Sequence, residues 1–222
     1  MIMRVLLAAI IAGMLAGAVA GAFQIWRVTP LILAAEVYEN QTGAGAIQQA
    51  EAWAPEEGIE RTAYTLLASL LMGVGFALVL AAAVLFTGRA ITVQNGVLWG
   101  IMGFIVFSLA PTTGLAPELP GMPAADLLAR QTWWWGTVIA TGSGIALIVL
   151  QEQLALKALG VIPIVAPHVI GAPHLQDPES AVPAVLAANF AANTLTMMAL
   201  FWIVLGVSLG WALNRTGTSA ES

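Results

Sequence analysis

Long apolar stretches alternate with shorter polar ones along this chain of 222 residues. Five apolar stretches reach or approach the roughly 20 residues that a helix needs to cross the hydrocarbon core of a bilayer. They cover residues 5–26, 62–86, 93–110, 133–150 and 185–213. A helix satisfies its backbone hydrogen bonds internally, as lipid requires of any spanning segment. The pattern therefore predicts an all-α integral membrane protein, with a bundle of about five transmembrane helices in a single membrane domain, residues 1–222.

The first connection, residues 27–61, is predicted to be partly helical. Thr29 and Pro30 are the residue types of a helix cap and a first helical position, so we expect a break followed by a new helix. The first span could be mistaken for a secretory signal, but its apolar run exceeds the roughly 7–15 residues of a signal core. We therefore expect this span to be retained, and an odd number of spans to place the two termini on opposite sides.

The connection before the last span, residues 151–184, is rich in proline. Within it, residues 158–178 contain four prolines, each of which lacks a backbone donor and obstructs the preceding turn. They are Pro163, Pro167, Pro173 and Pro178. No regular helix is therefore expected through residues 158–178. Because irregular backbone at membrane depth must be covered by protein or water, a re-entrant path is one way to arrange this Pro-broken connection.

The composition agrees with a membrane protein. Hydrophobic residues make up 59% of the chain and charged residues 9%, whereas a soluble domain carries about 25% charged residues. The net charge of −5 argues against a nucleic-acid partner. The chain has no cysteine, which excludes disulfides and thiolate metal sites. A bound metal would therefore depend on imidazole, carboxylate, carbonyl or thioether ligands.

Small residues recur at every fourth position in several spans, a pattern that lets helices approach closely within lipid. In the first and last spans these helix-packing residues are Gly13, Gly17, Gly21, Gly206 and Gly210. Three consecutive indoles, Trp133, Trp134 and Trp135, stand where the fourth span is predicted to begin. Indoles concentrate at headgroup level, so we interpret them as interface anchors, with substrate stacking as the alternative.

The only two histidines of the chain, His168 and His174, lie in the proline-rich connection, and Asp177 and Glu179 follow them closely. Imidazole with nearby carboxylate is suitable for divalent cobalt, nickel or zinc. These four residues are the candidate metal ligands. The alternative is that both histidines only form hydrogen bonds across a folded loop.

Polar residues near or within the spans could line a cation pathway. Glu36 and Glu39 are three residues apart and share one helix face, where they form either a pathway mouth or a solvated surface. Asn189 and Asn193 are one helical turn apart in the last span. Their oxygens could hold a cation transiently or form hydrogen bonds between helices. Thr137 and Thr141 form the weakest set, since threonines often bond to their own helix carbonyls.

Several segments along the chain resemble the CbtA family, predicted cobalt transporter subunits of bacterial membranes. They are TPLILAAEVYE at 29–39, RQTWWWGTVIAT at 130–141, PHVIGAPH at 167–174, and the last span with Asn189, Phe190 and Asn193. The resemblance implies cobalt uptake linked to cobalamin supply, by a multi-pass protein of the bacterial inner membrane. Besides the lipid bilayer, it implies a small single-span, His-rich CbtB-like subunit as partner. Whether the chain also forms a homo-oligomer is left open.

Two functions remain open from the sequence. The first is a permease component that takes up a divalent transition-metal cation, cobalt with nickel or zinc as alternatives, without a tightly bound cofactor. The second is a non-transporting membrane scaffold or assembly subunit of a metal-uptake complex, in which the histidines only brace their loop. The sequence contains no GxxxxGK[ST], G-x-S-x-G or HExxH motif. Transport driven by ATP through the usual phosphate loop and an enzyme activity are therefore not expected.

Overall fold

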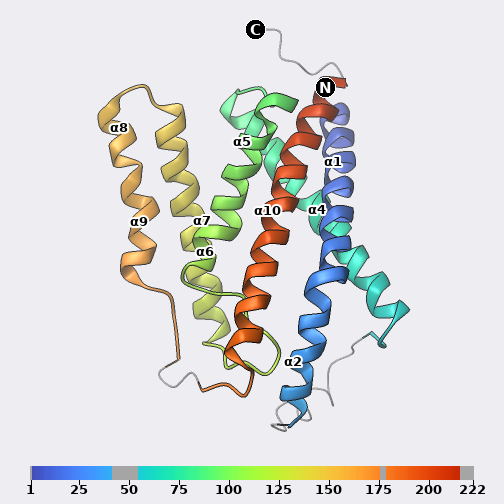
Figure 1. Ribbon diagram of the computed structural model, residues 1–222. Coiled ribbons are helices and arrows are strands. Elements are labelled where there is room, and N and C mark those ends of the chain that lie inside the picture. The colour runs from blue at the N-terminus through green and yellow to red at the C-terminus, as the bar shows by residue number, and fades with distance from the viewer. Residues whose placement is uncertain (1, 42–54, 176–178, 216–222) are drawn as a thin grey trace. The chain divides into compact units, whose positions relative to one another are not determined.

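The computed structural model describes residues 2–41, 55–175 and 179–215, which are helical apart from their connections (Figure 1). The elements are α1 (Ile2–Phe23), the π-helical turn η1 (Gln24–Val28), α2 (Thr29–Gln41), α4 (Ile59–Thr87), α5 (Val93–Phe104), the π-helical turn η2 (Ile105–Leu109), α6 (Ala110–Thr112), α7 (Leu127–Leu150), α8 (Leu154–Leu159), α9 (Val161–Ile170) and α10 (Ala184–Arg215). Five helical stretches are long and apolar enough to cross a membrane, and each contains one predicted span. The prediction of an all-α membrane protein is confirmed.

The chain divides into two compact units. Unit 1 contains residues 1–29, 53–104 and 196–222, and unit 2 contains residues 30–52 and 105–195. The helix α10 belongs to unit 2 in its first part and to unit 1 from Thr196 onward.

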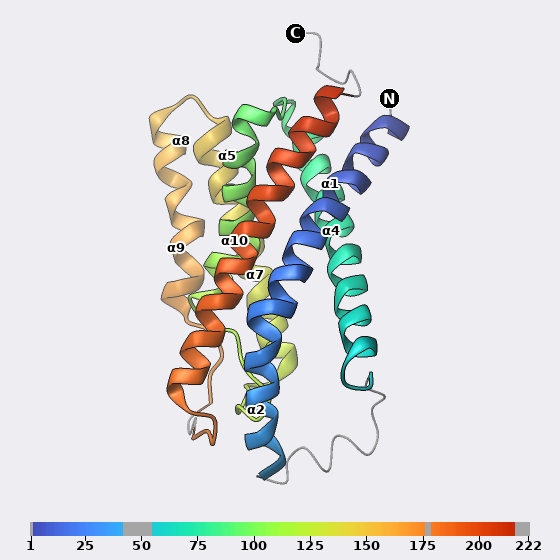
Figure 2. The ribbon, with the colours of Figure 1, turned by 45° about the vertical axis from the view of Figure 1, so that its right-hand side comes forward.

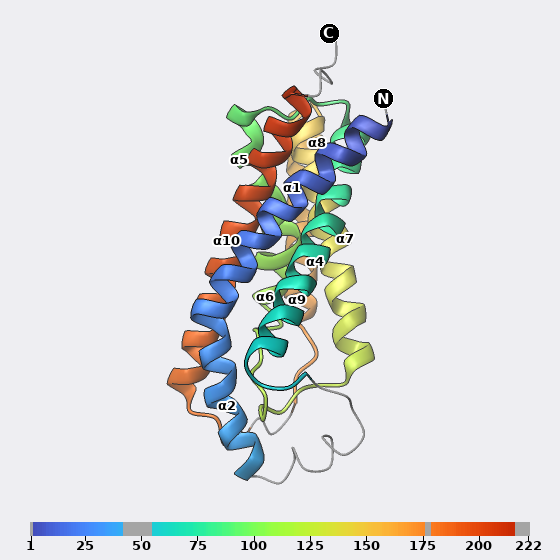
Figure 3. The same ribbon diagram turned by 90° about the vertical axis from the view of Figure 1, so that its right-hand side faces the viewer.

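In unit 1, small residues bring α1 and α4 into backbone contact (Figures 2 and 3). A Cβ atom built on Gly13 would lie 2.5 Å from the Cα of Val74, and one built on Gly17 would lie 2.5 Å from the carbonyl oxygen of Ser69. Gly73 of α4 faces Gly13 in the same way. The two helices run antiparallel, because residues with increasing numbers along α1 contact residues with decreasing numbers along α4. Close approach of this kind replaces the hydrophobic drive that lipid removes.

The second helix pair of unit 1 is formed by α5 and the last part of α10. A Cβ atom on Gly96 would lie 2.5 Å from the carbonyl oxygen of Gly206, and Gly210 meets the backbone of Thr92. The Ile2 end of α1 and the Arg215 end of α10 lie at the same end of this unit (Figure 2). The expectation of termini on opposite sides is therefore wrong, because the connection before α10 makes an additional return.

Two prolines are accommodated inside continuous helices by π-helical turns. Pro30 follows η1 by two residues, and Pro111 follows η2 by two residues. In η1 the backbone N–H of Thr29 donates to the carbonyl of Gln24, five residues earlier. A proline cannot donate to the carbonyl four residues before it and crowds that group, and a widened turn relieves the crowding. The expected break at Thr29 is therefore wrong, although α2 makes the connection partly helical. Residues 42–54 lie outside the described part of the chain.

In unit 2, the connection before α10 folds back along α7 as α8 and α9 (Figure 1). The expectation that no helix runs through residues 158–178 is wrong up to Ile170. Pro163 lies in the first turn of α9, where backbone N–H groups have no partner within the helix, so its missing donor costs little. Pro167 lies within the helix, and α9 ends three residues later. Residues 154–170 are apolar but shorter than the five spanning stretches.

The contact between α1 and α4 predicts a specific sensitivity to added volume. Gly17→Ala should destabilise the chain by about 1–3 kcal/mol, because its new methyl group would meet the backbone of Ser69. Gly75→Ala is the matched control, since nothing lies within 4 Å of a Cβ atom there. Denaturant unfolding in detergent would measure both. Equal stability of the two variants would contradict this packing.

Candidate functional site

The first histidine lies where three elements of unit 2 meet. His168 is in the last turn of α9, and its Nδ1 atom lies 3.1 Å from the hydroxyl oxygen of Thr113, just after α6. Its ring meets that of Trp133 of α7 edge to face, with centroids 6.2 Å apart and planes at 70°. The imidazole is otherwise exposed. Its position is therefore determined by the return of α9 along α7.

The hydrogen bonds of Thr113 determine the tautomer of His168. The single hydroxyl proton of Thr113 is donated to the carbonyl of Ala110, at 2.7 Å. Toward His168 the same oxygen can then only accept, so Nδ1 must carry a proton. In the neutral ring, Nε2 therefore has the free lone pair. A histidine that binds metal usually donates from its other ring nitrogen in this way.

The second histidine follows the end of α9 and has the same tautomer. Gly171 ends the helix with φ of 88°, a left-handed conformation that favours glycine, and the chain then turns toward α7. The Nδ1 atom of His174 lies 3.0 Å from the carbonyl oxygen of Ala172. A carbonyl can only accept, so Nδ1 carries the proton and Nε2 has the lone pair. The side chain is exposed.

His174 and Asp126 line one open pocket of unit 2. Asp126 caps α7, and its Oδ1 atom accepts from the backbone N–H of Ala129, at 2.9 Å. Thr132 and Trp133 of α7 and residues 171–173 line the same pocket. Within the described residues, no group of three or more His, Cys, Asp or Glu side chains is placed to hold a metal. The pocket therefore offers one imidazole and one carboxylate.

The three consecutive tryptophans lie in three different surroundings. They stand inside α7, which begins at Leu127, rather than at its start. Trp133 packs on Gly114, where a Cβ atom would lie 2.7 Å from the Cζ2 atom of its ring, and its Nε1 atom is buried with no hydrogen-bond partner in the described part of the chain. Trp134 lies 6.4 Å from the ring of Phe107, and Trp135 is exposed. Trp133 is therefore a packing partner of the histidine connection, and the anchoring role stays a prediction.

The other predicted site residues are dispersed. Glu179 is exposed, and Asp177 lies outside the described residues. Glu36 and Glu39 are half-buried on α2, and Gly121 of the connection between α6 and α7 approaches the backbone of Glu39. The structure thus brings none of Glu36, Glu39 and Glu179 into the pocket of His174.

Among the predicted pathway amides and the threonines of α7, Asn193 and Thr137 form side-chain hydrogen bonds within their own helices. The side-chain amide of Asn193 donates to the carbonyl of Asn189, at 2.8 Å. Thr137 is fully buried, and its hydroxyl donates to the carbonyl of Trp133. Thr141 is also fully buried, but its hydroxyl has no partner among the described residues.

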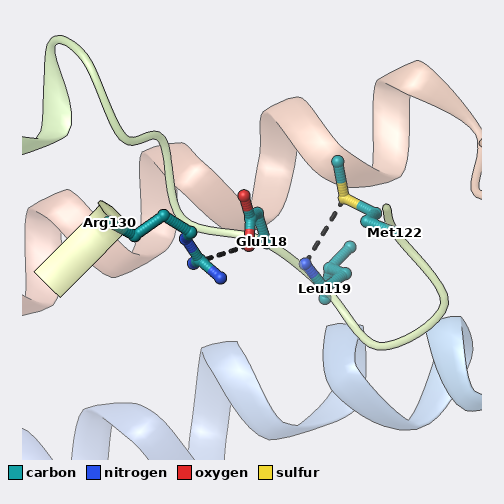
Figure 4. A network of polar contacts seen from close by, with 4 residues as sticks. All are labelled: Glu118, Leu119, Met122 and Arg130. Carbon is teal, nitrogen blue, oxygen red and sulfur yellow. Dashed lines mark hydrogen bonds and ion pairs between the residues drawn. The ribbon is translucent and has the colours of Figure 1, made fainter. Parts of the chain in front are cut away.

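Sequence reasoning missed two acidic residues of unit 2. Glu118 forms an ion pair with Arg130 of α7, with 2.7 Å between its Oε2 atom and the guanidinium nitrogen (Figure 4). Beside it, the backbone N–H of Leu119 donates to the sulfur of Met122, at 3.4 Å, and closes the turn. No periodicity connects Glu118 with Arg130 across an irregular connection. Asp126 could have been recognised as a helix cap from the apolar run after it, but not as a neighbour of His174.

The fold and these side chains define a multi-pass helical membrane protein with two imidazoles oriented as metal ligands usually are. The family model described as "Probable cobalt transporter subunit (CbtA)" matches residues 2–214, nearly the whole chain. The chain therefore belongs to the CbtA family. Membership makes it a cobalt transporter subunit, which points away from enzyme activity, and the word subunit implies a partner. No curated protein and no solved structure matches the chain.

The hydrogen bonds of the two imidazoles predict their protonation pattern. Both neutral rings should carry the proton on Nδ1, because Thr113 and Ala172 each present an accepting oxygen to that atom. Nitrogen NMR of the chain labelled at histidine would show this directly, since only two rings contribute and each is assigned by single replacement. A signal for protonated Nε2 in either neutral ring would contradict the assignment.

Proposed function

We propose that this chain is the membrane permease component for uptake of a divalent transition-metal cation, with cobalt as the principal cargo, linked to cobalamin supply. The observation that carries the proposal is the family match over residues 2–214. The orientation of His168 and His174 supports it, because both Nε2 atoms are left for a ligand. Nickel and zinc have the same ligand preferences and remain alternative cargoes.

The proposed capture step uses the two imidazoles at one end of the hairpin formed by α7 and α9. Both rings are exposed, so an arriving cation can reach them without local unfolding. Asp177 and Glu179 are proposed as additional ligands from the same connection. A few weak ligands favour conduction, because an ion that is bound too tightly cannot leave the site.

The proposed pathway continues through uncharged and acidic oxygens. Glu36 and Glu39 are proposed at a pathway mouth, and Asn189 and Asn193 as a transient stop in the last span. The driving force would be the membrane potential, which supplies roughly 2.3 kcal/mol per charge for each 100 mV. A divalent ion gains twice that amount, so inward movement needs no nucleotide.

The proposed setting is the bacterial inner membrane, with a small single-span, His-rich CbtB-like subunit as partner. The cation is cargo, and no tightly bound cofactor is proposed. The other candidate is the non-transporting scaffold, in which Trp133 and Thr113 merely brace the imidazole of His168. Their contacts with that ring agree with both functions, so transport measurements must separate them.

The proposal predicts that the paired exchange His168→Ala with His174→Ala lowers cobalt uptake roughly tenfold or more in cells that depend on scarce external cobalt. The reason is the loss of both imidazole ligands. Uptake is measured with radioactive cobalt in a strain that expresses the chain together with its partner.

The matched control is the paired exchange Gln151→Ala with Gln153→Ala, which alters two exposed polar residues at the other end of α7. It should leave uptake unchanged. Unchanged uptake by the histidine variant would remove the ligand role of these residues. Absence of cobalt uptake by the unaltered chain with its partner would instead favour the scaffold.

A further inference from the structure

Asp126 is the acidic residue that the fold adds to the histidine connection. It lies 48 residues before His174 in the sequence, yet both line one pocket, because α9 returns along α7 and Gly171 turns the chain over the start of α7. None of the sequence patterns connects the two residues. We propose that Asp126 binds the divalent transition-metal cation together with His174 at the capture site, an inference that rests on the proposed function.

The ring of His174 is already oriented for this role. Its Nδ1 proton is used by the carbonyl of Ala172, so Nε2 is the atom that binds a cation. The bond to a backbone carbonyl also limits rotation of the ring. A histidine that merely fills space in an exposed connection needs no such bond.

Asp126 combines a structural role with an open ligand position. One carboxylate oxygen accepts from the N–H of Ala129 and caps α7, which keeps the side chain at the pocket. A carboxylate has two oxygens, so the second can face a cation while the cap remains intact. Thr132 donates its hydroxyl proton to the carbonyl of Leu128, at 2.7 Å. Its oxygen in the same pocket can therefore accept from a water molecule bound to the cation.

The ligand set determines which cations fit. One imidazole with one carboxylate suits cobalt, nickel and zinc better than magnesium or calcium, which prefer oxygen ligands alone. The described residues supply no third His, Cys, Asp or Glu beside this pair, so water would occupy the positions that the other proposed ligands leave open. Binding would then be weak and reversible, as a capture site in a transport route requires.

The test is the affinity of the purified full chain in detergent for cobalt ions, measured by titration calorimetry. Asp126→Asn should weaken binding roughly tenfold or more, while the thermal unfolding midpoint stays unchanged, because asparagine caps a helix as well as aspartate does. Asp126→Ser, which also caps, should behave in the same way. Glu152→Gln, which neutralises an exposed carboxylate beyond the other end of α7, is the matched control and should leave affinity unaltered.

A double-mutant cycle tests whether the two residues share one ion. In a His174→Ala background, Asp126→Asn should weaken binding much less than it does alone, since the common ligand site is already lost. Wild-type affinity in Asp126→Asn, or full additivity of the two exchanges, would overturn the inference. Cobalt uptake by cells would still decide the proposed function separately, because another carboxylate could then serve as the ligand.

Discussion

The backbone contact between α7 and α9 is the constraint on which the candidate site depends. Gly144 and Gly160 approach so closely that a Cβ atom on Gly160 would lie 2.7 Å from the carbonyl oxygen of Gly144. In lipid, helices associate through such close packing, because burial of apolar surface no longer drives them together. Once the two helices are joined at this end, the antiparallel direction of α9 carries His168 to Trp133. The surroundings of the imidazoles therefore depend on the close contact of two glycines that bind no ligand themselves.

Proline is the residue whose effect differs most between the sequence and the fold. The five spans could be predicted, because a run of about 20 apolar residues has few alternatives in a membrane protein. The behaviour of individual prolines could not, because their local penalty is relieved by surrounding backbone. Pro30 and Pro111 follow π-helical turns inside continuous helices, and Pro163 occupies a first helical turn. The additional return of the chain through α9 depends on this tolerance, and the described ends of α1 and α10 lie at the same end of unit 1.

The candidate site was predictable in part. His168 and His174 could be identified as candidate ligands from the sequence, because the chain has no other histidine. The adjacent sequence predicts Asp177 and Glu179 as their carboxylate neighbours. The fold instead places Asp126 in the pocket of His174, through a helix hairpin whose register depends on packing. Sequence spacing describes contacts within one element well, but it contains little information on contacts across a hairpin of this length.

We propose that imidazole nitrogen, presented by the returning hairpin, binds the transported metal. X-ray absorption at the cobalt edge, measured on the cobalt-loaded chain, reports the ligand atoms directly. We expect a mixed shell of nitrogen and oxygen, with the multiple-scattering pattern of imidazole. A shell of oxygen alone, without imidazole scattering, would contradict it.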